Sequence, residues 1–307
     1  MKILVSGGAG FIGSQIVDAY LQEGHKVVVI DDLSRGKKEN LAKGVKFYQI
    51  DICQQKKLNK ILEKEKPEII NHHAAQIELR KSVSHPQLDA KINILGSINL
   101  LESAVKIHAK KFIFASTGGA LYGEQKKFPA DETHPIQPLS PYGIAKRAVE
   151  LYLYYYYQVH NLEYVSLRYS NVYGPRQDPY GEAGVVAIFC EKLWSGASPI
   201  INGSGEQTRD FVYVQDVVEA NVLALKKGVI GEFNIGTGKE SSVNQIYKIL
   251  SQIIGSKITP QYGPQKKGEQ MRSVLDPALA EKTLGWKPKI SLEEGLKLTA
   301  EFFKPKS

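Results

Sequence analysis

The chain has 307 residues, of which 42% are hydrophobic and 23% are charged, a balance typical of a soluble globular protein with a substantial core. No apolar run approaches the roughly 18 residues that span a bilayer, and the N-terminus lacks the pattern of a secretory signal, so we expect a cytoplasmic protein with no membrane partner. The formal net charge is +8, but the lysines are scattered in short pairs, which argues against a nucleic-acid partner.

The first half of the chain alternates short apolar runs with helical patterns. The candidate strands are residues 2–6, 26–30, 45–50, 68–73, 111–116 and 164–169. The candidate helices are residues 11–23, 89–108 and 142–160. The strands are apolar on both faces and the helices carry one apolar stripe, a combination typical of βαβ units. We therefore predict an α/β fold, a Rossmann-type doubly wound parallel sheet with a smaller, interleaved substrate-binding lobe.

The second half of the chain is interrupted more often by proline and glycine. Shorter helical patterns occur at residues 184–195 and 243–254, and residues 211–217 look like a return to the main sheet. We expect a Rossmann domain over residues 1–170, with 205–225 returning to it, and a substrate-binding lobe over residues 171–204 and 226–307.

A glycine-rich segment, residues 7–13, joins the first candidate strand to the first candidate helix. Its glycines let the backbone turn tightly and approach a pyrophosphate, which the first amides of the helix then face. Asp31 ends the second strand, where its carboxylate can accept both hydroxyls of an adenosine ribose and would repel a 2′-phosphate. The pattern predicts a dinucleotide site that prefers NAD to NADP, although two cations, Arg35 and Lys37, follow closely.

Tyr142 and Lys146 stand four residues apart at the start of a candidate helix, so their side chains share one face. The pKa of tyrosine is ordinarily about 10, but a nearby ammonium and a positive nicotinamide favour the phenolate. Tyr142 is thus a candidate general base near neutral pH, and Lys146 is also placed to hold the nicotinamide ribose. Ser116 and Thr117 add hydroxyl groups at the end of a preceding strand.

Together these motifs resemble those of the extended short-chain dehydrogenase/reductase family, and within it the sugar-nucleotide 4-epimerases. The resemblance covers nearly the whole chain, through residues 7–13, 31, 51–52, 73–76, 93, 116–123, 142–146, 167–176, 209–212 and 284–288. It implies tightly bound NAD and reversible epimerisation at C4 of a UDP-hexose, such as UDP-glucose or UDP-galactose. It also implies a homodimer, in which the apolar stripes of residues 89–108 and 142–160 pair as a four-helix bundle.

The resemblance also assigns residues to the reaction. Tyr142 takes the proton of the sugar 4-hydroxyl while hydride moves from C4 to the nicotinamide, and the 4-keto sugar then rotates and takes the hydride back on its other face. The implied catalytic residues are Tyr142, Lys146 and Thr117. The implied NAD contacts are Gly7, Gly10, Phe11, Ile12, Gly13, Asp31, Asp32, Ser34, Gly36, Asp51, Ile52, His73, Ala74, Ala75, Gln76, Asn93, Ser116, Tyr142, Lys146 and Tyr169. The implied UDP-sugar contacts are Thr117, Tyr142, Asn171, Val185, Val186, Arg209, Lys266, Glu269 and Ser273. No metal is expected, because His72 and His73 lack a third ligand.

Three departures from the family pattern bear on the substrate. Residues 266–269 read Lys-Lys-Gly-Glu where the family usually has Arg-x-Gly-Asp, so a GDP- or dTDP-sugar stays an alternative. Ser273 falls near a position that a bulky residue occupies in similar enzymes, and its small side chain suggests room for an N-acetyl group. Counting back from Tyr142 places Thr117 at the family's hydroxyl position, whereas counting back from residues 122–123 places Gly118 there.

Other functions stay open at this point. A 4,6-dehydratase of the same family carries an acidic pair after the threonine, where this chain has Gly118 and Gly119. A uronic-acid 4-epimerase or decarboxylase needs contacts for a sugar carboxylate, which the sequence does not identify. A non-catalytic NAD-binding regulator would keep the glycine-rich segment but would need neither Tyr142 nor Lys146.

Overall fold

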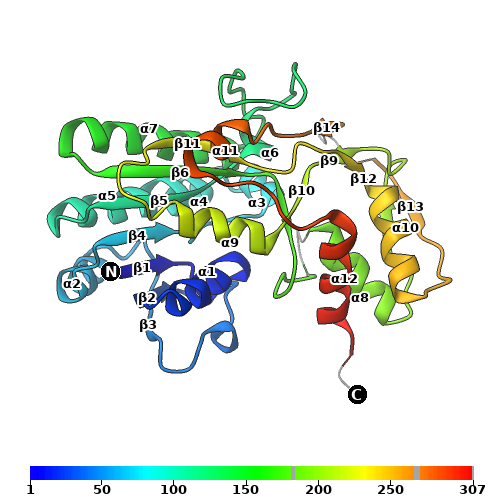
Figure 1. Cartoon of the computed structure of the whole chain (residues 1–307), viewed down its shortest axis with the longest axis horizontal. Coiled ribbons are helices and arrows are strands. Elements are labelled where there is room, and N and C mark those ends of the chain that lie inside the picture. Colours follow the sequence, from blue (N-terminus) through cyan, green and yellow to red (C-terminus); the bar gives the residue numbers. More distant parts are fainter. Residues whose placement is uncertain (181–183, 266–269, 306–307) are drawn as a thin grey trace.

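A sheet of seven parallel strands lies at the centre of the computed structural model, which describes residues 1–180, 184–265 and 270–305 (Figure 1). The strand order is β11-β6-β5-β4-β1-β2-β3. The strands are β1 (Lys2–Ser6), β2 (Lys26–Asp31), β3 (Lys46–Gln49), β4 (Ile69–His72), β5 (Lys111–Thr117), β6 (Glu163–Tyr169) and β11 (Gly231–Ile235). The predicted α/β fold is confirmed, and all six candidate strands lie in this sheet.

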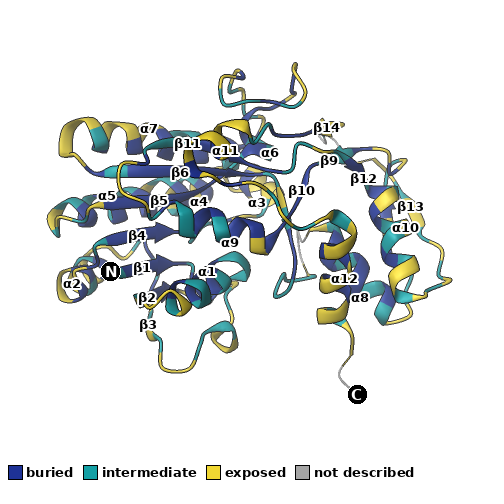
Figure 2. Cartoon of the chain, in the orientation of Figure 1, coloured by how far each residue is buried: buried dark blue, intermediate teal, exposed yellow. Residues whose placement is uncertain are grey.

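Helices cover both faces of the sheet. One face carries α1 (Phe11–Gln22) and α9 (Val214–Leu223), and the other carries α2 (Gln55–Glu65), α5 (Gly96–Lys106) and α7 (Pro141–His160). Successive residues of a strand point to opposite faces, so Ile3 and Val5 join one core and Leu4 joins the other. Figure 2 shows the strands buried and the outer faces of the helices exposed. None of the described helices is long and apolar enough to cross a membrane.

Residues 89–106 lie in a continuous helical run, as their spacing predicts, but the run contains a π-helical turn that the spacing does not predict. The short helix α4 (Pro86–Ala90) leads into a π-helical turn, η2 (Lys91–Leu95), before α5 begins. Within η2, the side chain of Asn93 bonds to the backbone of Gln76, in the loop after β4. The wider turn thus depends on a contact with another segment, which periodicity alone does not reveal, and such turns are frequent at functional sites.

A smaller lobe lies beside the carboxyl ends of the strands, at the right of Figure 1. Its helices α8 (Val185–Trp194), α10 (Val243–Ile254) and α12 (Leu292–Phe303) share a core of their own. Its strands form three small sheets, β10 (Phe211–Tyr213) with β7 (Asn171–Tyr173), β12 (Ser241–Ser242) with β9 (Thr208–Arg209) and β14 (Arg272–Ser273), and β13 (Gln261–Gly263) with β8 (Ile200–Asn202). The remaining short helices are η1 (Lys38–Asn40), α3 (Leu79–Ser84), α6 (Gly118–Leu121) and α11 (Ala278–Leu284).

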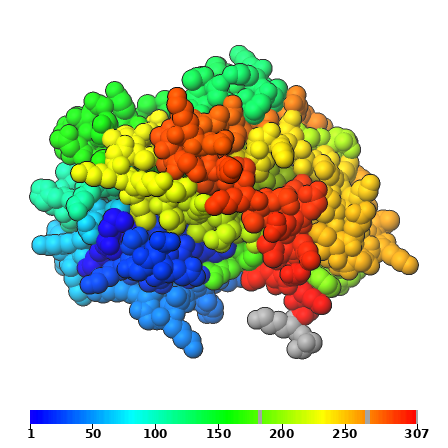
Figure 3. Space-filling model, in the orientation of Figure 1, coloured from blue at the N-terminus to red at the C-terminus, as the bar shows by residue number. Residues whose placement is uncertain are grey.

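The expected return of residues 211–217 to the main sheet is wrong for their strand. β10 pairs with β7 outside the main sheet, and only the following helix, α9, returns to the sheet by packing beside α1 (Figure 3). The strand that does return is β11, which pairs with β6. A three-residue apolar run is too short to identify its partner from its own pattern. We therefore propose that the part of residues 205–225 that returns to the expected NAD-binding domain, residues 1–170, is α9 rather than the strands before it, and that this domain also includes residues 231–235.

Candidate active site

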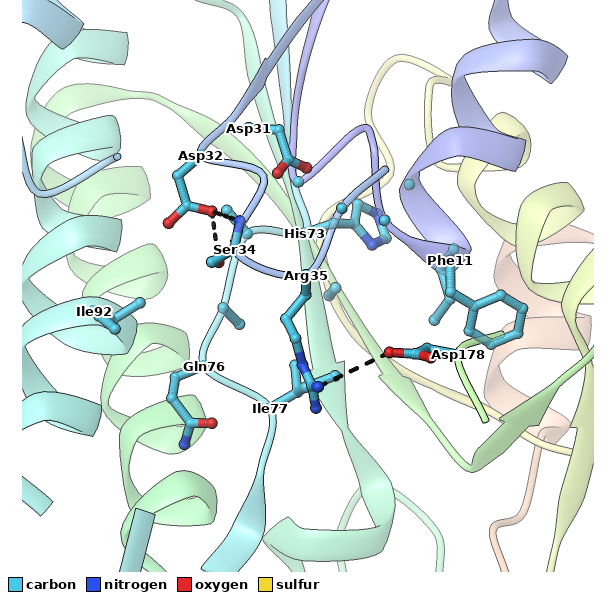
Figure 4. Close-up of a pocket in the computed structure, with 18 of the residues that line it drawn as sticks. Phe11, Asp31, Asp32, Ser34, Arg35, His73, Gln76, Ile77, Ile92 and Asp178 are labelled. Atoms are coloured by element: carbon cyan, nitrogen blue, oxygen red, sulfur yellow. Dashed lines mark hydrogen bonds and ion pairs between the residues drawn. The ribbon is translucent and has the colours of Figure 1, made fainter. Parts of the chain in front are cut away.

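A cavity of about 320 Å³ opens at the carboxyl ends of the central strands (Figure 4). The residues predicted to surround NAD all line it, except Asn93. Asn93 lies behind the wall, bonded to the backbone of Gln76. The prediction did not include several polar lining residues on loops, namely Arg35, Lys37, Asn40, Arg176, Gln177 and Asp178. Of these residues, Arg176 could have been predicted as a cavity residue from the sequence, because it ends the family motif at residues 167–176.

The glycine-rich segment forms a tight loop before α1. Gly7 has a φ of +69°, and a Cβ on it would lie 2.5 Å from the backbone nitrogen of Ala74. A Cβ on Gly13 would collide with the carbonyl oxygen of Gly7. The first amides of α1 have no partners within the helix, and its first turn carries no acidic residue. The loop therefore fits the pyrophosphate of a dinucleotide.

Asp31 and Arg35 distinguish between the two nicotinamide cofactors. The carboxylate of Asp31 accepts hydrogen bonds from two backbone amides, at 3.0 and 2.9 Å. Burial raises the pKa of this carboxyl, and the two hydrogen bonds oppose the rise. The guanidinium of Arg35 is paired with Glu78 at 2.8 Å. It also lies 3.9 Å from the carboxylate of Asp178 (Figure 4). Because carboxylates already surround Arg35, it is poorly placed to bind a 2′-phosphate, which favours NAD.

Tyr142 and Lys146 line the cavity from the first turns of α7. The Nζ of Lys146 donates a hydrogen bond to the carbonyl oxygen of Ala115 at 2.7 Å and lies 5.7 Å from the centre of the Tyr142 ring. Burial lowers the pKa of Lys146 to about 8, against the opposing charges of Asp89 and Glu150. Burial also raises the pKa of Tyr142 above its ordinary value, and the charge of Asp89 adds to the rise.

These surroundings correct the expectation for Tyr142. The sequence suggested that the neighbouring ammonium and a positive nicotinamide together favour the phenolate, whereas among the groups of the protein alone desolvation dominates and favours the neutral form. With only the groups of the protein around it, Tyr142 is a neutral phenol at pH 7. A further positive charge beside the ring, such as that of an oxidised nicotinamide, is needed to make it a base.

The hydroxyl groups at the end of β5 have different partners. Ser116 donates a hydrogen bond to the buried carboxylate of Glu150 at 2.8 Å. Thr117 Oγ1 accepts one from a backbone amide of α6 at 3.2 Å, which leaves its own proton available for a sugar oxygen. A Cβ on Gly118 would collide with the side chain of Leu275, so this position faces the core. The contacts support Thr117, rather than Gly118, at the family's hydroxyl position.

A second cavity of about 180 Å³ lies in the smaller lobe. Four of the predicted UDP-sugar contacts line it, namely Asn171, Val185, Val186 and Arg209. Gly184 lines both cavities, so the two adjoin. Thr117 is half-buried and Ser273 is buried, and neither lines these two cavities; Ser273 pairs with Arg209 across β14 and β9. Lys266 and Glu269 lie outside the described residues.

Comparison with known proteins agrees with this geometry. A model of the NAD dependent epimerase/dehydratase family matches residues 3–236. The chain belongs to this family.

Several 4-epimerases, two of them with solved structures, are similar to this chain over nearly its whole length. UDP-glucose 4-epimerase of Mycolicibacterium smegmatis is 43% identical over 313 residues, which is 100% of both chains. The crystal structure of UDP-glucose 4-epimerase from Thermotoga maritima, with UDP-glucose, matches with a TM-score of 0.97 and 53% identity over 99% of this chain and 98% of that one. UDP-N-acetylglucosamine 4-epimerase from Methanobrevibacter ruminantium, in complex with UDP-N-acetylmuramic acid, matches with a TM-score of 0.93 and 36% identity over 98% and 97%.

Membership in the NAD dependent epimerase/dehydratase family confirms the family resemblance and the choice of NAD as cofactor. It also confirms that the chain is an enzyme. The roles of the individual residues stay predictions.

The two adjacent histidines have ordinary structural surroundings in this epimerase-family protein. The ring nitrogens of His72 form hydrogen bonds with the hydroxyls of Ser6 at 2.7 Å and Ser97 at 2.8 Å. The ring of His73 stacks on Tyr169, with 6.2 Å between centres. Burial lowers the pKa of both, that of His73 to about 3, so both rings are neutral near pH 7. Within the described part of the chain, no group of three or more His, Cys, Asp or Glu could hold a metal ion.

Proposed function

We propose that this protein interconverts UDP-glucose and UDP-galactose by epimerisation at C4, as a step of galactose metabolism. One observation carries the proposal: Tyr142 and Lys146 stand at the wall of the dinucleotide cavity, which adjoins a second cavity bearing Asn171 and Arg209. The names of the similar epimerases support the same reaction and the same nucleotide.

Each residue has a distinct task in this reaction. The phenolic oxygen of Tyr142 takes the proton of the sugar 4-hydroxyl and later returns it, while Thr117 donates a hydrogen bond to the same sugar oxygen. The ammonium of Lys146, fixed on a backbone carbonyl, stabilises the negative charge on Tyr142. When bound, NAD would supply the hydride acceptor that epimerisation at C4 needs, held by the residues that line the first cavity. Arg209 holds the diphosphate, so the sugar can turn while the nucleotide stays fixed.

The stereochemistry of the product tests this function. With NAD present, UDP-glucose should yield UDP-galactose, and the same mixture should form from either sugar, as read at C4 by NMR. Parallel reactions with GDP-glucose, dTDP-glucose and UDP-glucuronate distinguish the alternatives, since a 4-keto-6-deoxy product indicates a dehydratase and released CO₂ a decarboxylase. A protein that binds NAD but converts none of these sugars would be a regulator, and the proposal would be wrong.

Gly119 bears on the size of the sugar that the site accepts. Gly118 and Gly119 lie in α6 without a positive φ, and a glycine in a helix costs roughly 1 kcal/mol relative to alanine. The close approach of Leu275 explains Gly118, but a Cβ on Gly119 would meet only Thr117 Oγ1 and Asn171 Oδ1, each at 4.0 Å. Among the described glycines without a positive φ, Gly119 alone faces such open space. We propose that this space accommodates a sugar substituent as large as an N-acetyl group.

Gly119→Ala should therefore discriminate against the larger sugar. We expect the unaltered protein to act on both UDP-glucose and UDP-N-acetylglucosamine, and the variant to lose about tenfold more kcat/KM on the acetylated sugar, since a methyl group in a pocket is worth roughly 1–3 kcal/mol. Steady-state rates on both sugars measure the ratio. The melting temperature should not fall, because alanine favours the helix. In contrast, Gly118→Ala should lower the melting temperature through its clash with Leu275 and leave the ratio unchanged. Equal losses on the two sugars in Gly119→Ala would contradict the assignment.

We further propose that the protein is a homodimer in the cytoplasm. Its two cysteines are unpaired, as expected in a reducing compartment. The apolar stripe of α7 that we expected to pair between subunits packs within the protomer instead, because Val149 and Leu153 are fully buried against the sheet. The opposite stripe of α7 is exposed, with Leu151 at 54%, Tyr155 at 48% and Val159 at 56%. A second copy covering this stripe would remove a large apolar surface from water.

Light scattering at micromolar concentration should give twice the 34.1 kDa mass of the chain. Leu151→Glu should shift the mass toward one chain, because a charge in the middle of an apolar contact is costly to bury. As a control, a glutamate introduced on an exposed helix elsewhere, as Lys57→Glu in α2, should leave the mass unchanged. A single-chain mass for the unaltered protein would exclude the dimer.

A further inference from the structure

Three polar side chains, those of Gln76, Asp89 and Asn93, form a buried cluster behind the dinucleotide cavity. Oδ1 of Asp89 accepts hydrogen bonds from Nε2 of Gln76 at 3.0 Å and from Nδ2 of Asn93 at 2.9 Å. Asn93 also bonds to both the N–H and the C=O of Gln76. Only 1% of Asp89 is exposed. Because Gln76 lines the cavity, the cluster fixes part of the cavity wall.

The charge of Asp89 is not required for these hydrogen bonds. The amide oxygen of an asparagine could accept the same two bonds. Oδ2, the second carboxylate oxygen, is buried and has no hydrogen-bond partner among the described residues. Burying a carboxylate with one oxygen unsatisfied is unfavourable, so the charge at this position needs another explanation.

The position of α4 supplies that explanation. α4, which carries Asp89, packs directly against α7, which carries Tyr142 and Lys146. Burial raises the pKa of Asp89, and its two hydrogen bonds and the charge of Lys146 oppose the rise. In turn, the charge of Asp89 adds to the rise of the Tyr142 pKa and opposes the lowering of the Lys146 pKa by burial. The π-helical turn η2 holds Asn93 against Asp89, so the carboxylate has a fixed orientation.

We propose that Asp89 is a positioning residue for the proton transfer, holding Gln76 and Asn93 through one oxygen and placing the negative charge of the other beside the Tyr142–Lys146 pair. Asp89 lines neither cavity, so it acts through residues that touch the substrate and the cofactor. The inference rests on the proposed epimerase function and adds a residue to it.

Other charged or titratable groups lie on the elements packed around Tyr142 and Asp89, among them His72, His73, Arg80, Lys81, Lys91, Arg147 and Glu150, with Glu102, Lys106, Lys111, Glu163 and Arg168 on α5, β5 and β6. The two histidines are neutral because burial lowers their pKa. Glu150 is held in an ion pair with Arg168, and of Tyr142 and Lys146 its charge acts on Lys146. Among the described residues, Asp89 is therefore the carboxylate whose charge acts on both Tyr142 and Lys146.

A negative charge at position 89 favours the protonated form of both neighbours, so it raises the pKa of Tyr142 and that of Lys146. Catalysis needs Tyr142 deprotonated and Lys146 protonated, so the dependence of kcat/KM on pH is bell-shaped, and its two apparent pKa values belong to the coupled pair. Removing the charge lowers both values. The whole pH profile of kcat/KM should then move to lower pH.

Asp89→Asn is the decisive variant, because it preserves the shape and the two accepted hydrogen bonds and removes only the charge. We expect both limbs of the kcat/KM profile to move down by about one pH unit, with the NAD content unchanged. Asp89→Glu retains the charge and should keep the limbs in place, even where it lowers the maximum. A profile of Asp89→Asn that falls in height without moving would overturn the proposal and leave Asp89 a purely structural role.

A second measurement is independent of epimerase activity. Ultraviolet difference titration of the NAD-loaded protein against its Tyr142→Phe variant reports the ionisation of Tyr142 alone. The apparent pKa of Tyr142 should be lower with Asp89→Asn than without it. An unchanged pKa of Tyr142 would overturn the role of Asp89, whatever sugar the enzyme converts. A lowered pKa of Tyr142 in a protein without epimerase activity would contradict only the proposed reaction.

Discussion

Tyr142→Phe should lower kcat for epimerisation by about 10²–10⁴-fold, because phenylalanine keeps the ring at the cavity wall but has no oxygen to take the proton of the sugar. KM should change little, since the second cavity with Arg209 still binds the nucleotide. Steady-state rates with UDP-glucose, followed by product stereochemistry at C4, measure both quantities.

Two controls separate lost chemistry from lost structure. The NAD content and the melting temperature of Tyr142→Phe should match those of the unaltered protein. Tyr154→Phe alters the exposed face of the same helix outside the proposed dimer stripe, at a residue that is 56% exposed, and should leave kcat unchanged. Full activity in Tyr142→Phe would show that another group is the base.

Glu150→Ala should lower the free energy of unfolding by about 3–5 kcal/mol, the usual effect of breaking a buried ion pair from one side. The carboxylate of Glu150 is fully buried and accepts hydrogen bonds from Nε and Nη2 of Arg168, both at 2.9 Å. Ser116 and Ser166 also donate to it, at 2.8 and 3.0 Å. The variant leaves the guanidinium buried without an opposite charge and frees Ser116 at the catalytic end of β5. Urea unfolding followed by circular dichroism measures the loss.

Two further measurements separate the charge from the packing. Replacing both partners, as Glu150→Met with Arg168→Met, should restore most of the stability, because neither charge is left alone. Burial acts to raise the pKa of Glu150, but the hydrogen bond and charge of Arg168 outweigh it and hold the pKa below its ordinary value. The ion pair therefore stabilises the fold above the ordinary glutamate pKa, and this contribution is lost as the pH falls through the lowered one. Glu150→Ala should lack that part of the acid sensitivity, and unchanged stability at pH 7 would contradict the assignment.

The features of the site that the sequence predicts are those set by residues close together in the chain. The turn of residues 7–13 needs only a strand, its glycines and the following helix, and Asp31 needs only its place at a strand end. Tyr142 and Lys146 share a face through the helical repeat alone. For this reason all of them lie at one cavity, as predicted.

Other features depend on contacts between distant segments, which no local pattern contains. Asp89 matters because α4 packs on α7, and Gly118 and Gly119 differ only through the position of Leu275. Depth of burial, which sets the pKa of Tyr142, is likewise a property of the folded molecule. Ser273 was singled out for its small size, yet the pairing of β14 with β9 places it in a buried strand beside Arg209.

Arg35 joins two loops from different parts of the chain at the cavity, through Glu78 after β4 and through Asp178 after β7 (Figure 4). A C4 epimerase gives its hydride back to the molecule that supplied it, so each turnover ends at the oxidation state with which it began. Such a catalyst draws on no outside supply of oxidant and gains nothing from rapid exchange with the surrounding coenzyme pool. Ion pairs across the entrance of the cavity therefore suit a coenzyme that stays bound for the lifetime of the protein.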